Sequence, residues 1–355
     1  MNTKLKKIFK NKKILITGHT GFKGSWLTLW LSLLGARVTG ISFGYPTFPS
    51  HFKVIKIAKR INHKILDIRN FQNIKKTIKK IQPDFIFHLA AQSLVQTSYK
   101  DPLLTWSSNT LGSINILESL KVIKKNCNVI MITSDKSYKN LEIKRGYKEN
   151  DLLGGYDPYS ASKASAELAI QSYVNSYFNK NKNIKICIAR AGNVIGGGDW
   201  SKNRIIPDCY KSWSKNKRAI IRNPNSTRPW QHVLEAVYGY LVLAIKLKKN
   251  PKLHGQAFNF GPKTKKNYKV KELISVIEKS WKNFKWKNQS YKNSLYESNL
   301  LKLNSKKAEK ILGWKTKLKF KETIMITADW YKAYLLKTKK MINVSIEQIE
   351  NFQKK

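Results

Sequence analysis

A glycine-rich turn follows the first apolar segment of the chain and limits the possible folds more than any other feature. Residues 13–17 are predicted to form a buried strand, and residues 23–34 a helix. Between them, glycine occupies the first, fourth and seventh positions of Gly18-His19-Thr20-Gly21-Phe22-Lys23-Gly24. Glycine permits a tight turn and lets backbone N–H groups approach a pyrophosphate at a helix N-terminus. The turn therefore predicts a dinucleotide-binding α/β fold.

Short apolar segments alternate with amphipathic ones along the chain. The predicted strands lack polar alternation, as expected when helices cover both faces of a sheet. This spacing indicates βαβ units, and hence a Rossmann-type, doubly wound parallel sheet. The expected strands are 13–17, 37–41, 84–89, 128–133, 185–190 and 257–260, and the expected helices are 23–34, 73–81, 103–120, 160–178, 231–247, 270–281 and 305–312.

The pattern changes after Gly192, where a stretch rich in Gly, Asn, Pro and Trp begins. We predict a dinucleotide-binding domain and a smaller, discontinuous α/β lobe that binds the substrate. The domain would comprise residues 1–192 with about 231–260, the lobe residues 193–230 and 261–340, and a tail residues 341–355.

The formal net charge of +47 raises the possibility of a polyanionic partner such as nucleic acid. However, only nine of the 68 basic residues are Arg, and the Lys residues are spread over the whole chain. Arg is the residue that gives bidentate phosphate recognition. We therefore attribute the charge to compositional drift and expect no nucleic-acid partner, with a nucleic-acid-binding Rossmann protein as the remote alternative.

The cysteine pattern and the short apolar runs bear on location. Cys127, Cys187 and Cys209 are too far apart in sequence for a metal knuckle or a redox pair. Buried free thiols in a reducing compartment, and no metal site, are expected. The apolar runs near the N-terminus are too short for a signal peptide or a membrane span. These features predict a soluble, cytoplasmic protein with no membrane partner.

The sequence leaves the choice between NAD and NADP open. The acidic residue usually found about 20 positions after the glycine-rich turn is missing. The second strand ends in Gly40-Ile41-Ser42-Phe43-Gly44, which contains neither an acid nor an Arg.

Tyr159 and Lys163 form the second motif, within Tyr159-Ser160-Ala161-Ser162-Lys163. Residues four apart on a helix share one face. A nearby ammonium would stabilise the phenolate and lower the tyrosine pKa. The pair could then act as a base on a sugar hydroxyl, although such a spacing also occurs in surface pairs.

Ser134, Asp135 and Lys136 stand at the carboxyl end of a predicted strand. Ligands of open α/β sheets bind outside these strand ends. The three residues can therefore share a crevice with the glycine-rich turn and the Tyr159 helix. An acid beside an amine suits a reaction that needs both, which simple dehydrogenation does not. An ordinary polar loop is the alternative.

Three later polar residues are candidates for binding a diphosphate. Asn193 follows the strand that ends at residue 190, and Arg204 and Arg228 are among the few Arg residues of a Lys-rich chain. Guanidinium groups bind diphosphate bidentately. Structural salt bridges would explain the same residues equally well.

Taken together, these motifs resemble the extended short-chain dehydrogenase/reductase family over about residues 10–335. The resemblance rests first on the glycine-rich turn, His88-Leu89-Ala90-Ala91-Gln92, and Tyr159 with Lys163. More particular matches are Thr133-Ser134-Asp135-Lys136, Asp157-Pro158-Tyr159-Ser160, Ala191-Gly192-Asn193-Val194-Ile195-Gly196-Gly197-Gly198-Asp199-Trp200 and Arg228-Pro229-Trp230-Gln231-His232-Val233.

The resemblance implies a lyase, an NAD-dependent nucleotide-sugar 4,6-dehydratase of deoxysugar biosynthesis for O-antigen or other surface polysaccharide. Tyr159 would remove the C4 hydroxyl proton while hydride passes from C4 to NAD. The C4 ketone acidifies C5, water leaves from C5 and C6, and hydride returns at C6. A nucleotide-sugar 4-epimerase, which needs no acid/base pair at residues 135 and 136, is the alternative within the family.

The resemblance also assigns roles to residues. Ser134 would bind the C4 oxygen, Asp135 would protonate the C6 hydroxyl, and Lys136 would transfer the C5 proton. Lys163 would bind the nicotinamide ribose. The other NAD contacts would be Gly18, Thr20, Gly21, Phe22, Gly24, Asp67, Ile68, Leu89, Ala90, Ala91, Gln92 and Tyr159. The substrate contacts would be Asn193, Arg204, Arg228, Tyr296 and Glu297.

The family resemblance further suggests a homodimer or homotetramer. The subunits would associate through the two long helices predicted near residues 103–120 and 160–178.

Overall fold

The computed structural model describes residues 3–181, 183–263, 266–289 and 300–355. Its centre is a seven-stranded sheet in the order β10-β6-β5-β4-β1-β2-β3, and every neighbouring pair is parallel. The strand bounds are β1 Lys13–Thr17, β2 Arg37–Ser42, β3 Asn62–Ile65, β4 Phe85–His88, β5 Cys127–Ser134, β6 Ile184–Ala191 and β10 Ala257–Phe260. The predicted Rossmann-type parallel sheet is confirmed.

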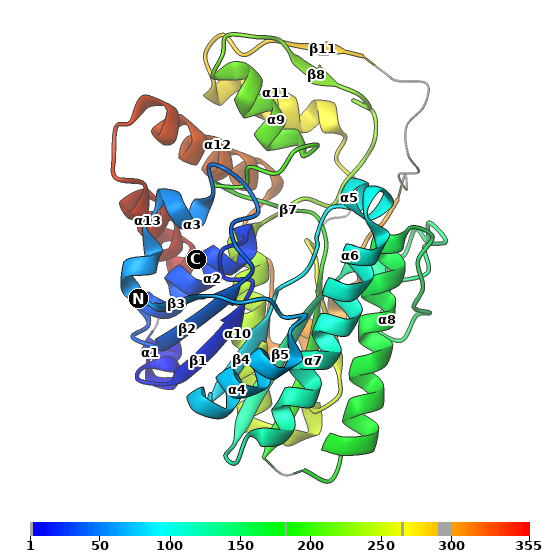
Figure 1. The fold of residues 1–355 in the computed structure, drawn as a ribbon. Coiled ribbons are helices and arrows are strands. Elements are labelled where there is room, and N and C mark those ends of the chain that lie inside the picture. Colours follow the sequence, from blue (N-terminus) through cyan, green and yellow to red (C-terminus); the bar gives the residue numbers. More distant parts are fainter. Residues whose placement is uncertain (1–2, 182, 264–265, 290–299) are drawn as a thin grey trace.

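Helices cover both faces of this sheet (Figure 1). In β1, Ile14 and Ile16 belong to the core cluster under one helical layer, whereas Leu15 belongs to the core cluster under the other. Strands buried on both faces in this way read as continuous apolar runs. The layer on the first side contains α2 Phe22–Leu33 and α10 Val233–Lys249, and the layer on the second contains α4 Phe71–Ile81, α7 Gly112–Ser119 and α8 Pro158–Tyr173.

The remaining helices are short or late in the chain. Short helices precede or join the main layers: α1 Thr3–Phe9, α3 His51–Val54, α5 Val95–Lys100 and α6 Pro102–Trp106. The later helices are α9 Ile205–Trp213, α11 Val270–Ser280, α12 Phe320–Leu336 and α13 Met341–Lys354. Single π-helical turns occupy Ser107–Leu111, Val174–Phe178 and Ala308–Leu312. Among the described residues, no helix combines the length and apolar character needed to cross a bilayer.

Two small parallel sheets lie outside the main one. β8 Ala219–Ile221 pairs with β11 Trp286–Asn288, and β7 Val194–Ile195 pairs with β9 Gln231–His232. Figure 1 shows β8, β11, α9 and α11 gathered at one end of the molecule. The exact limits of the two predicted domains remain a prediction.

Residues 341–355, predicted as a tail, form α13 and contribute to the core. Ile349 and Phe352 are buried in the cluster that also contains α2. The Ser345 hydroxyl lies 3.1 Å from His51 Nε2 and 3.0 Å from Trp330 Nε1. These contacts join the end of the chain to α3 and α12.

Candidate active site

The predicted site residues gather at the carboxyl edge of the main sheet. The glycine-rich turn follows β1, residues 89–92 follow β4, residues 134–136 end or follow β5, and Asn193 follows β6. The order of connection reverses between β1 and β4. Such a switch point is where open α/β sheets bind dinucleotides.

The glycine-rich turn is tightly packed against its surroundings. Gly18 has a φ of +75°, and a Cβ there would stand 2.6 Å from the backbone nitrogen of Ala90. A Cβ on Gly24 would stand 2.1 Å from the carbonyl oxygen of Gly18. Gly21 is less constrained, because its Cβ would be 3.2 Å from the same oxygen. The turn thus needs glycine at two of its three positions for steric reasons, because its backbone packs directly on Ala90 and on itself.

The polar side chains around the glycine-rich turn form hydrogen bonds with other parts of the protein. The Thr20 hydroxyl donates to the Gly44 carbonyl at 2.6 Å. The side-chain amide of Gln92 donates to the Leu94 carbonyl at 3.0 Å and to Thr105 Oγ1 at 2.9 Å. Thr20 and Gln92 therefore shape the loops, and any cofactor contact from them would come from the backbone or from remaining lone pairs.

Asp67 and Ile68 lie beyond β3, beside α7. Both oxygens of the Asp67 carboxylate accept hydrogen bonds from Arg69. Burial opposes ionisation, but these hydrogen bonds and the Arg69 charge hold the pKa of Asp67 below its usual value. The Ile68 side chain packs so closely on Gly112 that a Cβ there would be 2.5 Å from Ile68 Cδ1.

Tyr159 and Lys163 lie in the first two turns of α8. The helix begins at Pro158, and the Asp157 carboxylate accepts the backbone N–H of Ser160 at 3.0 Å, which caps the helix. Tyr159 and Lys163 are both buried. Capping therefore fixes the position at which both side chains enter the site.

The pKa of Tyr159 differs from the sequence-based expectation. Burial raises it to about 12, while a hydrogen bond with Ser134 and the charge of Arg204 oppose that rise. Burial also lowers the pKa of Lys163 to about 8, with a further contribution from Lys23. The expectation that Lys163 brings the tyrosine pKa towards neutrality is therefore not met in this structure, because desolvation of the phenolate outweighs the neighbouring charges.

Ser134 and Asp135 are buried at the end of β5 and joined to each other. Ser134 Oγ donates to Asp135 Oδ1 at 3.0 Å. Burial raises the pKa of Asp135, although Lys136, Ser134 and Lys23 oppose the shift. A Cβ on Gly192 would stand 2.5 Å from Asp135 Oδ2, so the loop after β6 closes directly over the carboxyl group. Asp135 is thus a shielded carboxyl group whose protonated form is favoured.

Lys136 is half-buried and lines a cavity of about 410 Å³. Asp157 and Ser160 from the start of α8 line the same cavity. The ammonium-bearing side chain is therefore placed between the end of β5 and the helix that carries Tyr159.

Lys23 was not selected from the sequence, but it faces the site from the second residue of α2. Burial lowers its pKa to about 8, with Arg204 lowering it further and Asp135 raising it. Lys23 also lowers the pKa of Lys163. Its position inside the glycine-rich turn was the available signal, since a cation there stands at the predicted cofactor-binding turn.

The charge of Arg204 acts on the site, whereas Arg228 lines a different cavity. Arg204 pairs with Asp199 at 2.7 Å, and this partner raises its pKa. Its charge also acts on Tyr159. The Asn193 carbonyl accepts the backbone N–H of Gln231 at 3.1 Å, which holds the loop after β6 to β9. Tyr296 and Glu297 lie outside the described residues.

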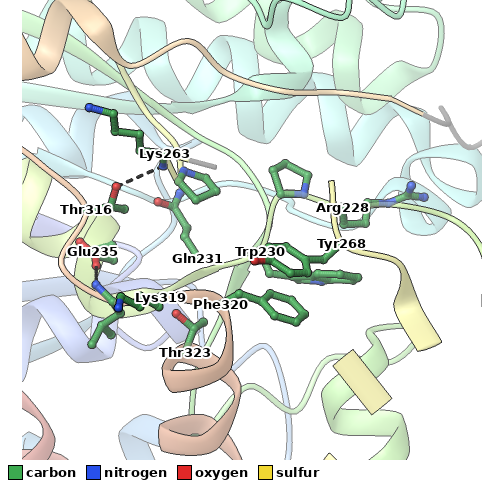
Figure 2. Close-up of a pocket in the computed structure, with 13 residues that line it drawn as sticks. Arg228, Trp230, Gln231, Glu235, Lys263, Tyr268, Thr316, Lys319, Phe320 and Thr323 are labelled. Atoms are coloured by element: carbon green, nitrogen blue, oxygen red, sulfur yellow. Dashed lines mark hydrogen bonds between the residues drawn. The ribbon is translucent and has the colours of Figure 1, made fainter. Parts of the chain in front are cut away.

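Arg228 lines a second, smaller cavity of about 190 Å³. Figure 2 shows Arg228 at one end of this cavity, with Lys263 and Glu235 at the other. Tyr268 and Phe320 stack with ring centroids 3.7 Å apart. Glu235 Oε1 accepts the backbone N–H groups of Lys317 and Leu318, each at 2.7 Å. Burial nevertheless raises the pKa of Glu235 to about 7.

The chain is similar in sequence to a family of dehydratases and to individual dehydratases. Residues 15–327 match the family model described as GDP-mannose 4,6 dehydratase. The chain is 40% identical to a CDP-glucose 4,6-dehydratase of Salmonella typhimurium over 93% of both proteins. It is 29% identical to a dTDP-D-glucose 4,6-dehydratase of Dictyostelium discoideum over 66% of this chain and 56% of that protein.

Solved structures show the same fold. An epimerase from Methanothermobacter thermautotrophicus superimposes with a TM-score of 0.80 at 23% identity, over 94% of this chain and 97% of that one. A dTDP-glucose 4,6-dehydratase from Streptomyces venezuelae, solved with NAD, gives a TM-score of 0.76 at 20% identity, over 93% of this chain and 99% of that one. The chain therefore belongs to the GDP-mannose 4,6 dehydratase family of extended short-chain dehydrogenases/reductases.

Proposed function

We propose that this protein is an NAD-dependent CDP-glucose 4,6-dehydratase, a lyase that forms CDP-4-dehydro-6-deoxyglucose and water. The choice of CDP-glucose is supported by the 40% identity to the Salmonella enzyme over 93% of each chain. The choice of NAD is supported by the dehydratase and epimerase structures of this fold that contain it.

One observation carries the assignment to dehydration: a buried carboxyl group is hydrogen-bonded to the serine beside the catalytic phenol. Ser134 Oγ contacts Asp135 at 3.0 Å and also bonds to Tyr159. Burial raises the pKa of Asp135, which makes this carboxyl group better suited to donate a proton than an exposed one. Oxidation at C4 would need the phenol as a base and NAD as the hydride acceptor, whereas loss of the C6 hydroxyl would also need such an acid.

The glycine-rich turn suits a dinucleotide. Gly18 and Gly24 let the backbone pack tightly where β1 leads into α2, and a helix N-terminus in such a turn offers backbone N–H groups to a pyrophosphate. The bound cofactor supplies reversible hydride acceptance. Gly18, Gly21 and Gly24 would hold its pyrophosphate, Asp67 and Ile68 would meet the adenine, and Lys163 would bind the nicotinamide ribose.

The residues at the strand ends would then divide the proton transfers. Tyr159 takes the C4 hydroxyl proton, and Ser134 hydrogen-bonds the C4 oxygen as it becomes a ketone. Lys136 removes the C5 proton, which the ketone has acidified, and Asp135 protonates the leaving C6 hydroxyl. Arg204 supplies positive charge for the diphosphate, assisted by Asn193 and Arg228.

The test is a comparison of CDP-, dTDP-, GDP- and UDP-glucose with added NAD. The expected result is the alkaline absorbance of a 4-keto-6-deoxy sugar, formed fastest from CDP-glucose. Absence of this product from all four substrates would rule out a dehydratase. Epimerised sugar that is still produced by the double variant Asp135→Asn with Lys136→Ala would identify a 4-epimerase instead.

We further propose that the protein is at least a homodimer, formed through α6, α7 and α8. Figure 1 shows these helices side by side on one flank of the molecule. Their segment exposes four large apolar side chains, with exposed fractions of 82% for Leu103, 56% for Leu111, 56% for Leu168 and 54% for Tyr177. Apolar patches of this kind mark association surfaces. Sedimentation should give a dimer or tetramer that Leu168→Glu dissociates, whereas a purely monomeric wild type would refute the proposal.

A further inference from the structure

A buried carboxylate on α8 holds both residues that flank the catalytic triplet. Glu167 is fully buried, and its Oε1 accepts the Thr133 hydroxyl at 2.7 Å and the Ser137 hydroxyl at 2.8 Å. Thr133 and Ser137 stand immediately before and immediately after residues 134–136. One oxygen atom therefore anchors the triplet at both of its ends.

Arg190 on β6 completes this anchor. Its Nε donates to both oxygens of Glu167 at 2.9 Å. Its Nη1 donates to the Tyr138 hydroxyl and to the Glu149 carbonyl. An ion pair buried without such partners costs more in desolvation than it gains, so it persists only where its hydrogen bonds are satisfied. Here those bonds join β5, β6, α8 and the segment between β5 and α8.

Glu167 shares its helix with the other half of the site. It follows Lys163 by four residues and Tyr159 by eight, so all three project from one face of α8. The Ser137 hydroxyl oxygen also lies 2.7 Å from the Ser134 carbonyl oxygen, so its single proton is shared between that carbonyl and Glu167. The position of the triplet relative to the phenol is thus fixed through Glu167 rather than through the loop between them.

We propose that Glu167 is a positioning residue for the dehydration step: it holds Ser134, Asp135 and Lys136 at a fixed distance from Tyr159 and Lys163. This inference rests on the proposed dehydratase function. It predicts that loosening the anchor slows elimination across C5 and C6 more than oxidation at C4, because elimination depends on Asp135 and Lys136.

Removing one hydrogen-bond donor at a time tests the positioning role of Glu167 and leaves the Glu167–Arg190 ion pair intact. Thr133→Val and Ser137→Ala each delete one hydrogen bond to Glu167. A misplacement of about 1 Å can cost on the order of 100-fold in rate. We expect kcat to fall about 10-fold in each single variant and about 100-fold in the double variant, with KM for CDP-glucose within about twofold.

The diagnostic readout is the reduced cofactor. In a single turnover, both variants should accumulate the absorbance of NADH, because oxidation at C4 outpaces elimination. Thr133→Ser, which keeps the hydroxyl, should restore the wild-type trace. Ser119→Ala and Thr327→Val remove buried hydroxyls that bond only within their own helices, at 2.7 and 2.8 Å, and serve as matched controls.

Unchanged kcat and unchanged NADH traces in Thr133→Val and Ser137→Ala, with only a lower melting temperature, would overturn the inference. That result leaves the proposed function standing, since the wild type still turns over. A wild type that forms no product from any nucleotide sugar would instead contradict the proposed function. If Ser137→Ala fails to fold, Thr133→Val with its Thr133→Ser rescue decides the matter.

Discussion

Gly24 lies directly over the carbonyl oxygen of Gly18, at a distance that excludes any side chain. A Cβ on Gly24 would be 2.1 Å from that oxygen, closer than any van der Waals contact allows. This close contact joins the end of β1 to the first turn of α2. It therefore closes the turn at which we propose that the cofactor binds.

The two glycines of this turn should respond differently to substitution. We expect Gly24→Ala to abolish measurable NAD binding and to lower the melting temperature, because the backbone of Gly18 must move. Gly21→Ala places its Cβ 3.2 Å from the same oxygen and should weaken NAD binding far less. Calorimetric titration with NAD measures both. Equal losses in the two variants would contradict this steric account.

Tyr159→Phe should remove the base for the C4 hydroxyl. General acid–base groups contribute about 100- to 10,000-fold to rate, so we expect kcat to fall within that range. Binding of CDP-glucose should change little, because the aromatic ring is retained. Tyr334→Phe, in the aromatic cluster near Trp200 and Trp330, is the matched control and should keep wild-type kcat. A Tyr159→Phe variant with normal turnover would eliminate the phenol as the base.

Lys136→Met should block proton transfer at C5. We expect about a 100-fold or greater loss of dehydration and loss of solvent deuterium incorporation at C5 of recovered sugar, while oxidation at C4 still produces NADH. Lys139→Met is the control, because Lys139 lines the same cavity three residues further on. Unchanged deuterium incorporation in Lys136→Met would assign the C5 proton to another residue.

Glu235 should make stability depend on pH near neutrality. Folding raises its pKa from 4.5 to about 7, so its contribution to stability is complete below pH 4.5 and is lost as the pH rises through about 7. The side-chain amide of the Glu235→Gln variant does not ionise. The variant should therefore gain stability relative to wild type between about pH 5 and pH 8, by at most roughly 3 kcal/mol.

Urea unfolding at several pH values measures this difference. Glu350→Gln, which changes an exposed carboxylate on α13, is the control and should give a small, constant difference. A pH-independent difference for Glu235→Gln would show that the buried carboxyl group of Glu235 is ionised throughout.

Some elements could be predicted closely from the sequence. Strand β1 has the predicted bounds, because its five residues are mostly apolar and the glycine-rich turn follows them directly. Strand β3, Asn62–Ile65, was missed since three of its four residues are polar and none of the four is buried. It is a strand because it pairs with β2 at the edge of the sheet. Helix α12 was missed as well, and its packing against α11 and α13 is a long-range property.

The candidate site likewise has features that could be predicted from the sequence and features that could not. The need for glycine at residues 18 and 24 was predictable, because the steric freedom of glycine is a property of the residue itself. Tyr159 and Lys163 are both buried on α8, where their spacing places them on one face, and their catalytic roles stay predictions. The position of Lys23 in the glycine-rich turn was visible in the sequence, but its electrostatic interactions with Asp135 and Lys163 were not, since a sequence does not tell which distant charges a side chain will face.

The sequence by itself therefore predicted the parallel sheet and the glycine-rich turn, because strand patterning, turn sterics and helical spacing can be read from residues close in sequence. The family was suggested by the resemblance of its motifs, and the relatives confirm it. The tertiary structure alone decided the electrostatics. It raises the pKa of Tyr159 to about 12 where spacing suggested a fall, and it anchors Thr133 and Ser137 on Glu167. Desolvation and Coulomb interactions depend on everything within several ångströms of a group, and only the folded chain specifies those neighbours.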